Sequence, residues 1–185
     1  MGVINKFNDA LSLWMNNHGF TNIDFVEGED FCYYYEKHTI QWGLLTNEKI
    51  DNYFLQFFYE YGLNASCLSP FTMSLLHELG HYMTLSNFSN NEAEQDSYAK
   101  SMNVSDGSID SQYWYWELPT EFAANMWAIN WANTHPQEFE ELRLLCKDYV
   151  MAIAEDANTM EQIDEWVEEI RSGNYIPLYI YEEDE

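Results

Sequence analysis

Two histidines four residues apart, His77 and His81, with a glutamate directly after the first, Glu78, form the most constraining pattern in the chain. On an α-helix, residues four apart lie on the same face, so the two imidazoles can bind one metal ion. Glu78 lies about 100° around such a helix from His77, where its carboxylate can accept a proton from a metal-bound water. The pattern therefore predicts a helix that carries a metal site with a base beside it.

The residues around this motif favour a helix with a buried face. Ser69 and Pro70 have the properties of a helix N-cap and of a first helical residue. Apolar residues then recur along the segment, at Phe71, Met73, Leu75, Leu76, Leu79 and Met83. The alternative is a chance arrangement on an ordinary amphipathic helix. We favour the metal site, because the chain has only five histidines and two of them stand where a zinc helix needs them.

A catalytic zinc site usually has three protein ligands and one open position for water. Asn87 stands where the extended motif H-E-x-x-H-x-x-G-x-x-H would place a third histidine. No histidine occurs between His81 and His135, so we expect a carboxylate as the third ligand. The candidates, in chain order, are Glu92, Glu94, Asp96, Glu117 and Glu121.

Glu121 is favoured by the residues that follow it. It heads a helical stripe of small residues that includes Ala124 and Ala128, which would let a second helix approach the motif helix closely. Asn125, one turn after Glu121, can hydrogen-bond a ligand imidazole, as metal-bound histidines generally require. The alternative is that Glu121 only stabilises the first turn of its helix. Glu117 is the next candidate.

Apolar spacing and turn residues predict the remaining elements. We expect helices at 3–17, 47–61, 120–133, 136–155 and 159–171, a short helix at 92–102 within the polar stretch 86–112, and a last strand at 175–181. Aromatic and β-branched residues at 25–26, 31–35 and 39–42 predict a small antiparallel or mixed sheet. The expected fold class is α+β, with this sheet packed on a mainly helical domain. At 185 residues, we expect one domain spanning 1–185.

The chain is strongly acidic, with 32 Asp and Glu against 7 Lys and Arg and a formal net charge of −25. Such a charge repels phosphate groups, so it argues against nucleic acid and anionic membranes as partners and favours basic ones. Alternatively, the acidity serves only solubility. Cys32, Cys67 and Cys146 include no C-x-x-C pair, so we expect reduced thiols. With no recognisable signal peptide or membrane-spanning apolar run, we expect a soluble cytoplasmic protein.

The motif at 77–81, followed by Glu121 and Asn125, resembles the gluzincin pattern, H-E-x-x-H and then E-x-x-x-D/N on a second helix. Residues 121–128 also resemble a segment of the ImmA/IrrE-like peptidases. These are small soluble zinc proteases of bacteria and mobile elements, some of which cleave transcriptional repressors. Asn125 stands where many gluzincins have aspartate, and it keeps the ability to hydrogen-bond His77.

This resemblance implies a zincin-like fold, in which the edge strand of the upper sheet lines the cleft and binds the substrate backbone. It also implies that Zn²⁺ is held by His77, His81 and Glu121, with Glu78 as the general base and Asn125 as the hydrogen-bond partner of His77.

We therefore expect a zinc metallopeptidase that cleaves a cytoplasmic protein or peptide, and the acidity favours one with a basic surface. Glu78 would take a proton from water and pass it to the leaving amine. A further donor must stabilise the oxyanion, and the candidates are Tyr82, Tyr113, Tyr115 and His135. One alternative is a non-catalytic acidic binding or inhibitor protein of a mobile element, which mimics DNA. Another is a hydrolase of non-peptide amides. The general base argues against a purely structural zinc site, which has no use for one.

Overall fold

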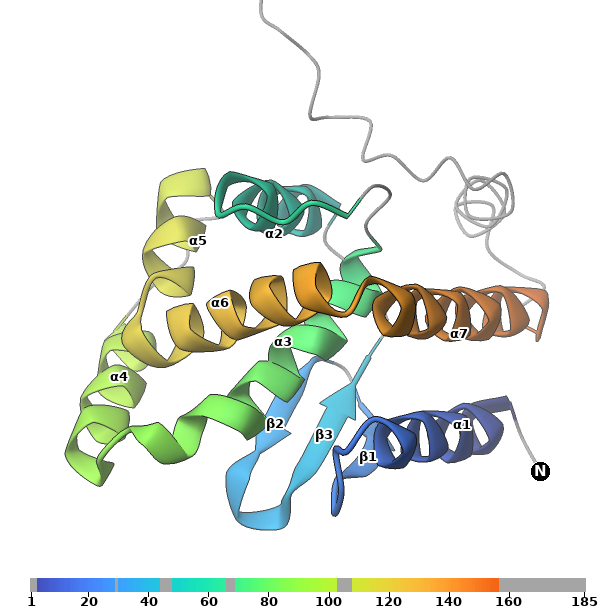
Figure 1. Cartoon of the computed structure of the whole chain (residues 1–185). Helices are drawn as coiled ribbons and strands as arrows, with labels where there is room; N and C mark the ends of the chain where they lie inside the picture. Colours follow the sequence, from blue (N-terminus) through green and yellow to red (C-terminus); the bar gives the residue numbers. More distant parts are fainter. Residues whose placement is uncertain (1–2, 29, 44–47, 66–68, 103–107, 157–185) are drawn as a thin grey trace, which may run out of the picture.

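The computed structural model describes residues 3–28, 30–43, 48–65, 69–102 and 108–156. Its helices are α1 (Val3–Asn17), α2 (Glu48–Glu60), α3 (Pro70–Thr84), α4 (Asn90–Met102), α5 (Ile109–Trp116), α6 (Pro119–Thr134) and α7 (Pro136–Asp156). Its strands are β1 (Asp24–Glu27), β2 (Cys32–Tyr34) and β3 (Thr39–Trp42), with short 3-10 turns at Tyr35–Lys37 and Leu85–Asn87. A mainly helical chain with one small sheet confirms the α+β class (Figure 1).

The sheet is mixed, in the order β1-β3-β2. β3 pairs with β1 in parallel, with Phe25 opposite Ile40, and with β2 in antiparallel fashion, with Tyr33 opposite Ile40. A purely antiparallel sheet is therefore wrong, and the mixed form is correct. Turn residues predict that the chain reverses direction, but they do not predict that β3 inserts between the two earlier strands. As a result β2 lies at an edge, next to α3.

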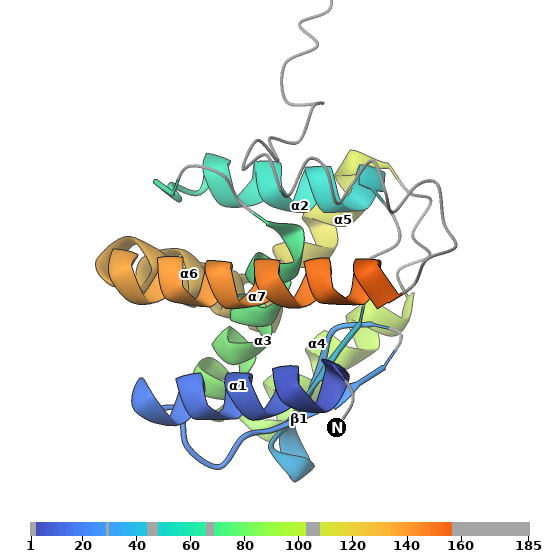
Figure 2. The same cartoon turned by 90° about the vertical axis from the view of Figure 1, so that its right-hand side faces the viewer.

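The motif helix α3 runs through the middle of the molecule. It contacts α2 towards one end, the strands β2 and β3 on one flank, and α6 and α7 on another (Figures 1 and 2). Every residue of α3 from Pro70 to Gly80 is buried. Ser69 caps the helix by accepting a hydrogen bond from the backbone N–H of Thr72 at 3.4 Å, and Pro70 follows as predicted. The motif is thus held on the most enclosed element of the described chain.

Small residues let α6 lie close against α3. Ala124, Ala128 and Ala132 are all buried. A Cβ atom added to Gly80, inside the motif, would lie only 2.8 Å from the Cα atom of Ala124 and would also meet the Ala124 carbonyl oxygen. The third residue between the two motif histidines is therefore a glycine for a packing reason, and this contact brings the start of α6 to the histidines.

The polar stretch is more helical than predicted. Ser89 and Glu92 form a reciprocal cap at the start of α4, in which the Ser89 N–H donates to the Glu92 carboxylate and the Glu92 N–H donates to the Ser89 hydroxyl. The aromatic run at 113–116, predicted only as a lead-in to the next helix, belongs to α5, which Ser108 caps.

The other predicted helices lie within one or two residues of α1, α2, α6 and α7. The predicted helix at 159–171 and strand at 175–181 fall outside the described residues. Among the described helices, none combines the length and the apolar character needed to cross a membrane.

Candidate metal centre

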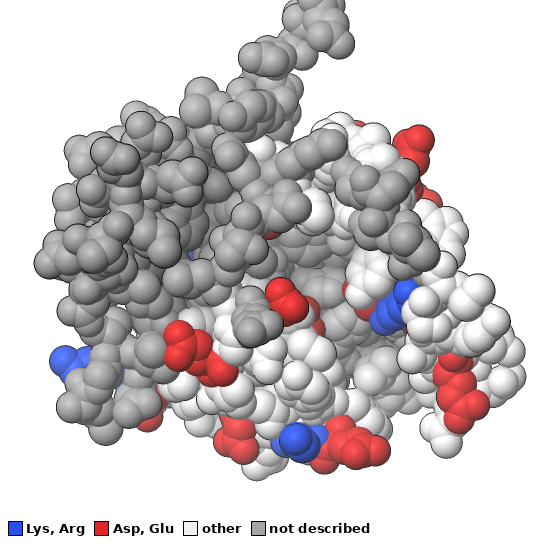
Figure 3. Space-filling model, turned by 180° about the vertical axis from the view of Figure 1, so that it is seen from behind, with Lys and Arg blue, Asp and Glu red and all other residues white. Residues whose placement is uncertain are grey.

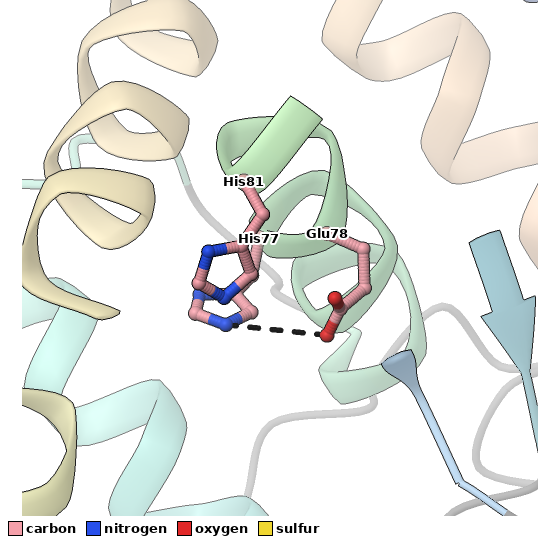
Figure 4. Close-up of side chains that lie close together, drawn as sticks. All are labelled: His77, Glu78 and His81. Carbon is pink, nitrogen blue, oxygen red and sulfur yellow. Dashed lines mark ion pairs between the residues drawn. The ribbon is translucent and has the colours of Figure 1, made fainter. Parts of the chain in front are cut away.

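The side chains of His77, Glu78 and His81 converge beside α3. Figure 4 shows both imidazoles on the same side of the helix, with the Glu78 carboxylate facing them across a short gap. The two rings lie 4.6 Å apart between centroids, and Nε2 of His77 lies 4.0 Å from Oε1 of Glu78. The possible ligand atoms of the three residues all lie within 4.8 Å of one another. The helical spacing thus produces the predicted cluster.

Glu121, in the first turn of α6, brings a second carboxylate to the same point. Its Oε2 atom lies 3.1 Å from Nε2 of His77, and its Oε1 atom lies 3.4 Å from Nε2 of His81. A tetrahedral zinc ion with ligands at about 2.0–2.1 Å separates neighbouring ligand atoms by about 3.3 Å. The spacing of 3.1 Å between Oε2 and His77 is close to that value, and the same carboxylate approaches His81 through its other oxygen. Two imidazoles and one carboxylate are a donor set that fits zinc.

Two carboxylates compete for the role of third ligand, and distance separates them. Glu121 approaches both imidazoles, whereas Glu78 stays 4.0 Å from His77. The Glu78 carboxylate also accepts a hydrogen bond from the backbone of Tyr33 on the edge strand β2. Glu78 is therefore held next to the metal-binding point rather than in it, which suits a base that acts on a bound water.

Asn125 determines which nitrogen of His77 faces the site. Its Nδ2 atom donates to the carbonyl oxygen of Trp116 at 3.2 Å, so its Oδ1 atom faces His77 and can only accept. Nδ1–H of His77 donates to that oxygen at 2.7 Å. The other nitrogen, Nε2, is then the one that faces Glu121: when protonated it donates to that carboxylate, and when deprotonated it offers the lone pair that a metal needs, as is usual for histidine ligands.

The ionisation of these groups follows from their mutual contacts. Burial tends to raise the pKa of Glu121, but hydrogen bonds from His77 and His81 hold it well below its usual range. Burial tends to lower the pKa of His77, but the hydrogen bond to Glu121 and the charges of Glu78 and Glu121 raise it. Burial also raises the pKa of Glu78, against the opposing charges of the two histidines. Glu121 is thus a carboxylate at neutral pH, as a ligand must be.

A cavity of about 470 Å³ opens over these four side chains. Its walls come from β2 and the residue before it, from α2, and from α5, whose Tyr115 and Trp116 contribute aromatic rings. The cavity has room for a segment of a ligand directly above the histidines and Glu78.

The other carboxylates predicted as third ligands make their contacts away from the two histidines. Glu117 accepts a hydrogen bond from the hydroxyl of Tyr61 at 2.7 Å, and Glu92 belongs to the cap of α4. Glu94 is exposed, and Asp96 is buried against Thr120 and Lys100. Glu121 is therefore the carboxylate that the fold brings to the histidines, although its role as a ligand stays a prediction.

The contacts of the four predicted oxyanion donors also distinguish them, because three of the four bond to other groups. The hydroxyl of Tyr113 donates to Glu60 at 2.9 Å, that of Tyr82 donates to the Thr21 carbonyl oxygen at 3.0 Å, and His135 lies 3.0 Å from the carbonyl oxygen of Trp131. Tyr115 differs from these three, because it lines the cavity.

Sequence reasoning missed Lys100. Its ammonium lies 2.5 Å from Oε1 of Glu121, and the residue lines the cavity. Burial tends to lower the pKa of Lys100, but Glu121 and Asp96 raise it, so the side chain is a cation. The only signal in the sequence is its spacing of four from Asp96, which places the two charges on one face of a helix.

Comparison with protein-family models, with curated proteins and with solved structures finds no match for this chain. Any assignment of function therefore depends on the motif and on the geometry around it.

Proposed function

We propose that this protein is a zinc-dependent metallopeptidase of the gluzincin type, with a zincin-like fold, closest in pattern to the ImmA/IrrE-like peptidases. The observation that carries the proposal is the convergence of His77, His81 and Glu121 at the spacing of zinc ligands, with Glu78 beside them in a cavity. A structural site would have no use for Glu78 and would normally close its fourth position.

In this mechanism His77, His81 and Glu121 hold the ion, and Asn125 keeps His77 in the required tautomer. When bound, zinc supplies a Lewis acid that polarises the scissile carbonyl and makes the attacking water more acidic. Glu78 accepts the proton of that water and delivers it to the leaving amine. Its raised pKa, caused by burial, suits a group that must take up a proton and release it in one cycle.

The edge strand β2 gives the proposed cleft a surface for an extended substrate. Its residues Cys32 and Tyr33 line the cavity, and Tyr33 already donates a backbone hydrogen bond to Glu78. A peptide laid along this strand would pass above the two histidines. Among the four oxyanion candidates, Tyr115 is the one that lines the cavity, and it is the donor that this proposal uses.

A cytoplasmic protein with a basic surface is the proposed substrate class. The formal charge of −25 would attract such a protein electrostatically. Figure 3 shows acidic side chains scattered over the described part of one face, with few basic ones. The free thiols of Cys32 and Cys146 suit a reducing compartment.

The test is Glu78→Gln, an isosteric change that removes the base. We expect the variant to retain zinc at the wild-type stoichiometry and to lose cleavage of proteins that the wild type cuts on co-expression, measured by comparing peptide termini in the two cultures. Glu117→Gln is the matched control, because it removes an exposed carboxylate bound to Tyr61. Equal cleavage by wild type and Glu78→Gln would overturn the proposal.

The ligand assignment has its own measurement. Glu121→Ala should lose stoichiometric zinc in elemental analysis, whereas Glu117→Ala should keep it. Full zinc in Glu121→Ala would transfer the ligand role to another carboxylate.

The acidity also favours a second candidate, a non-catalytic protein that occupies a basic partner by resembling DNA. This function would need the surface and not Glu78. A partner inhibited equally by wild type and by Glu78→Gln, without cleavage, would favour it over the peptidase.

A further inference from the structure

Lys100 brings a positive charge into the site from α4, an element that supplies none of the proposed ligands. Its Nζ atom lies 2.5 Å from Oε1 of Glu121, 3.1 Å from Oγ1 of Thr120 and 3.4 Å from Oδ2 of Asp96. An ammonium has three N–H donors. These three acceptors can use all of them, so Lys100 acts on the site through Glu121 rather than on a substrate directly.

The surroundings of Lys100 hold it in this place. Asp96 is 4% exposed and Thr120 is 3% exposed, and the Thr120 hydroxyl donates to the same Asp96 oxygen that faces Lys100. The ring of Tyr115 lies 5.9 Å from the ammonium. A buried carboxylate without its cation would be strongly destabilising, so Asp96 keeps Lys100 from swinging out into solvent.

The two oxygens of Glu121 have different surroundings. Oε2 lies closest to His77, whereas Oε1 makes its shortest contact with Lys100 and is 3.4 Å from His81. A hydrogen bond between an ammonium and a carboxylate is among the stronger ones in proteins. Lys100 therefore competes with any metal for Oε1 and leaves Oε2 available.

We propose that Lys100 is a positioning residue that holds Oε1 of Glu121, so that Glu121 binds the metal through Oε2 alone. The inference rests on the proposed function, because it assumes that the site binds zinc. Its consequence is an open ligand position. A carboxylate that bound through both oxygens would take up the place that the attacking water or the substrate carbonyl needs.

Cobalt(II) in place of zinc makes this testable, because four-coordinate cobalt absorbs visible light more strongly than five-coordinate cobalt. We expect the wild type to give the strong absorption. Lys100→Met should keep one cobalt per chain, because it removes a cation from beside a dication, but its visible absorption should be severalfold weaker. Turnover in the cleavage assay should fall about 10- to 100-fold, the usual range for a residue that positions a ligand.

Two variants make the result specific. Lys37→Met removes the same charge from an exposed site, where Lys37 lies over the Tyr34 ring, and should leave the spectrum unchanged. Lys100→Arg keeps a cation that can reach Glu121 and should restore part of the absorption. If Lys100→Met does not fold, the double variant Asp96→Asn/Lys100→Met removes the buried charge that would be left unpaired and should show the same weak spectrum.

An unchanged spectrum in a folded Lys100 variant that contains cobalt would overturn the inference and leave the proposed function intact. Loss of cobalt from a folded variant would also overturn it. Lys100 would then be required for metal binding itself and would not control how many Glu121 oxygens bind the ion. A wild-type protein that takes up neither cobalt nor zinc would overturn both the inference and the proposed function.

Discussion

His77 can offer Nε2 to a metal because Asn125 occupies its other nitrogen. We expect Asn125→Ala to weaken zinc binding about 10- to 100-fold, since the imidazole loses the partner that sets its tautomer and orientation. The measurement is a zinc competition with a chelating indicator. The free energy of unfolding should also fall, by about 1–3 kcal/mol, because Nδ1 of His77 and the Trp116 carbonyl oxygen lose a buried partner.

Asn133 gives a matched control for this change. It lies on the same helix and its amide also bonds to backbone, donating to Gly62 O at 2.9 Å and accepting from Asn64 N at 3.0 Å. Asn133→Ala should affect stability without affecting zinc binding. Equal zinc affinities in the two variants would contradict the role given to Asn125.

The buried thiol of Cys146 should make the free energy of unfolding depend on pH in the alkaline range. Burial raises the pKa of its thiol from 9.0 to about 12. Because the folded pKa is higher than the unfolded one, the contribution to stability is fully present below about pH 9 and is lost as the pH rises towards 12. Over that window one thiol contributes a slope of about 1.4 kcal/mol per pH unit. Urea unfolding at a series of pH values should show a shallower alkaline decline for Cys146→Ala than for the wild type, and parallel declines would contradict this reading.

At the residue scale, sequence reasoning reached the residues whose chemistry follows from local spacing. His77, Glu78 and His81 converge because four residues make about one helical turn. Glu121 could be predicted from the sequence because a stripe of small residues marks a helix that packs closely. Lys100 could not be predicted, since α4 has few apolar residues to indicate which of its faces is buried. Its role exists only because α4 folds back onto Thr120 and Glu121.

At the scale of elements, the contact between α3 and α6 decides whether the site can form. Gly80→Ala should improve helix propensity by about 1 kcal/mol. However, its Cβ would collide with the backbone of Ala124, a kind of overpacking that typically costs about 1–3 kcal/mol. We expect a net loss of stability in thermal unfolding and weaker zinc binding, because α6 must move away and take Glu121 with it.

The second variant that tests this contact is Ala124→Gly in the Gly80→Ala background. The clash involves the carbonyl oxygen, Cα and C atoms of Ala124 and not its methyl group, so removing the methyl should not restore zinc binding. A Gly80→Ala protein that is more stable than the wild type would show that the contact between α3 and α6 can accommodate the added methyl group.

The elements also show where local patterns stop being informative. Helices with a strong apolar stripe were predicted within a residue or two, as α1 and α2 illustrate. The parallel pairing of β1 with β3 was not predicted, because strand order depends on contacts between segments distant in sequence. The same holds for α5, whose aromatic residues at 113–116 favour a strand locally but pack against α2, where Phe57 meets Tyr113 and Trp116.

At the scale of the whole molecule, the proposed ion would join α3 to α6 in the centre of the fold. A ligand that binds only the folded state stabilises it by about 2.7 kcal/mol when its free concentration is 100 times its dissociation constant. In a protein of this size each kcal/mol shifts the melting temperature by roughly 2–4 °C. We therefore expect a chelator to lower the melting temperature by roughly 5–10 °C.

The pattern across variants tells whether this loss comes from the proposed site. Added zinc should restore the melting temperature and magnesium should not, because imidazole ligands suit zinc and magnesium prefers oxygen. Glu78→Gln should respond to the chelator as the wild type does, since Glu78 is a base and not a ligand. Glu121→Ala should be insensitive, because it lacks the carboxylate that ties α6 to the ion. If neither chelator nor zinc changes the melting temperature of the wild type, then His77, His81 and Glu121 lie close together only because the fold packs them there.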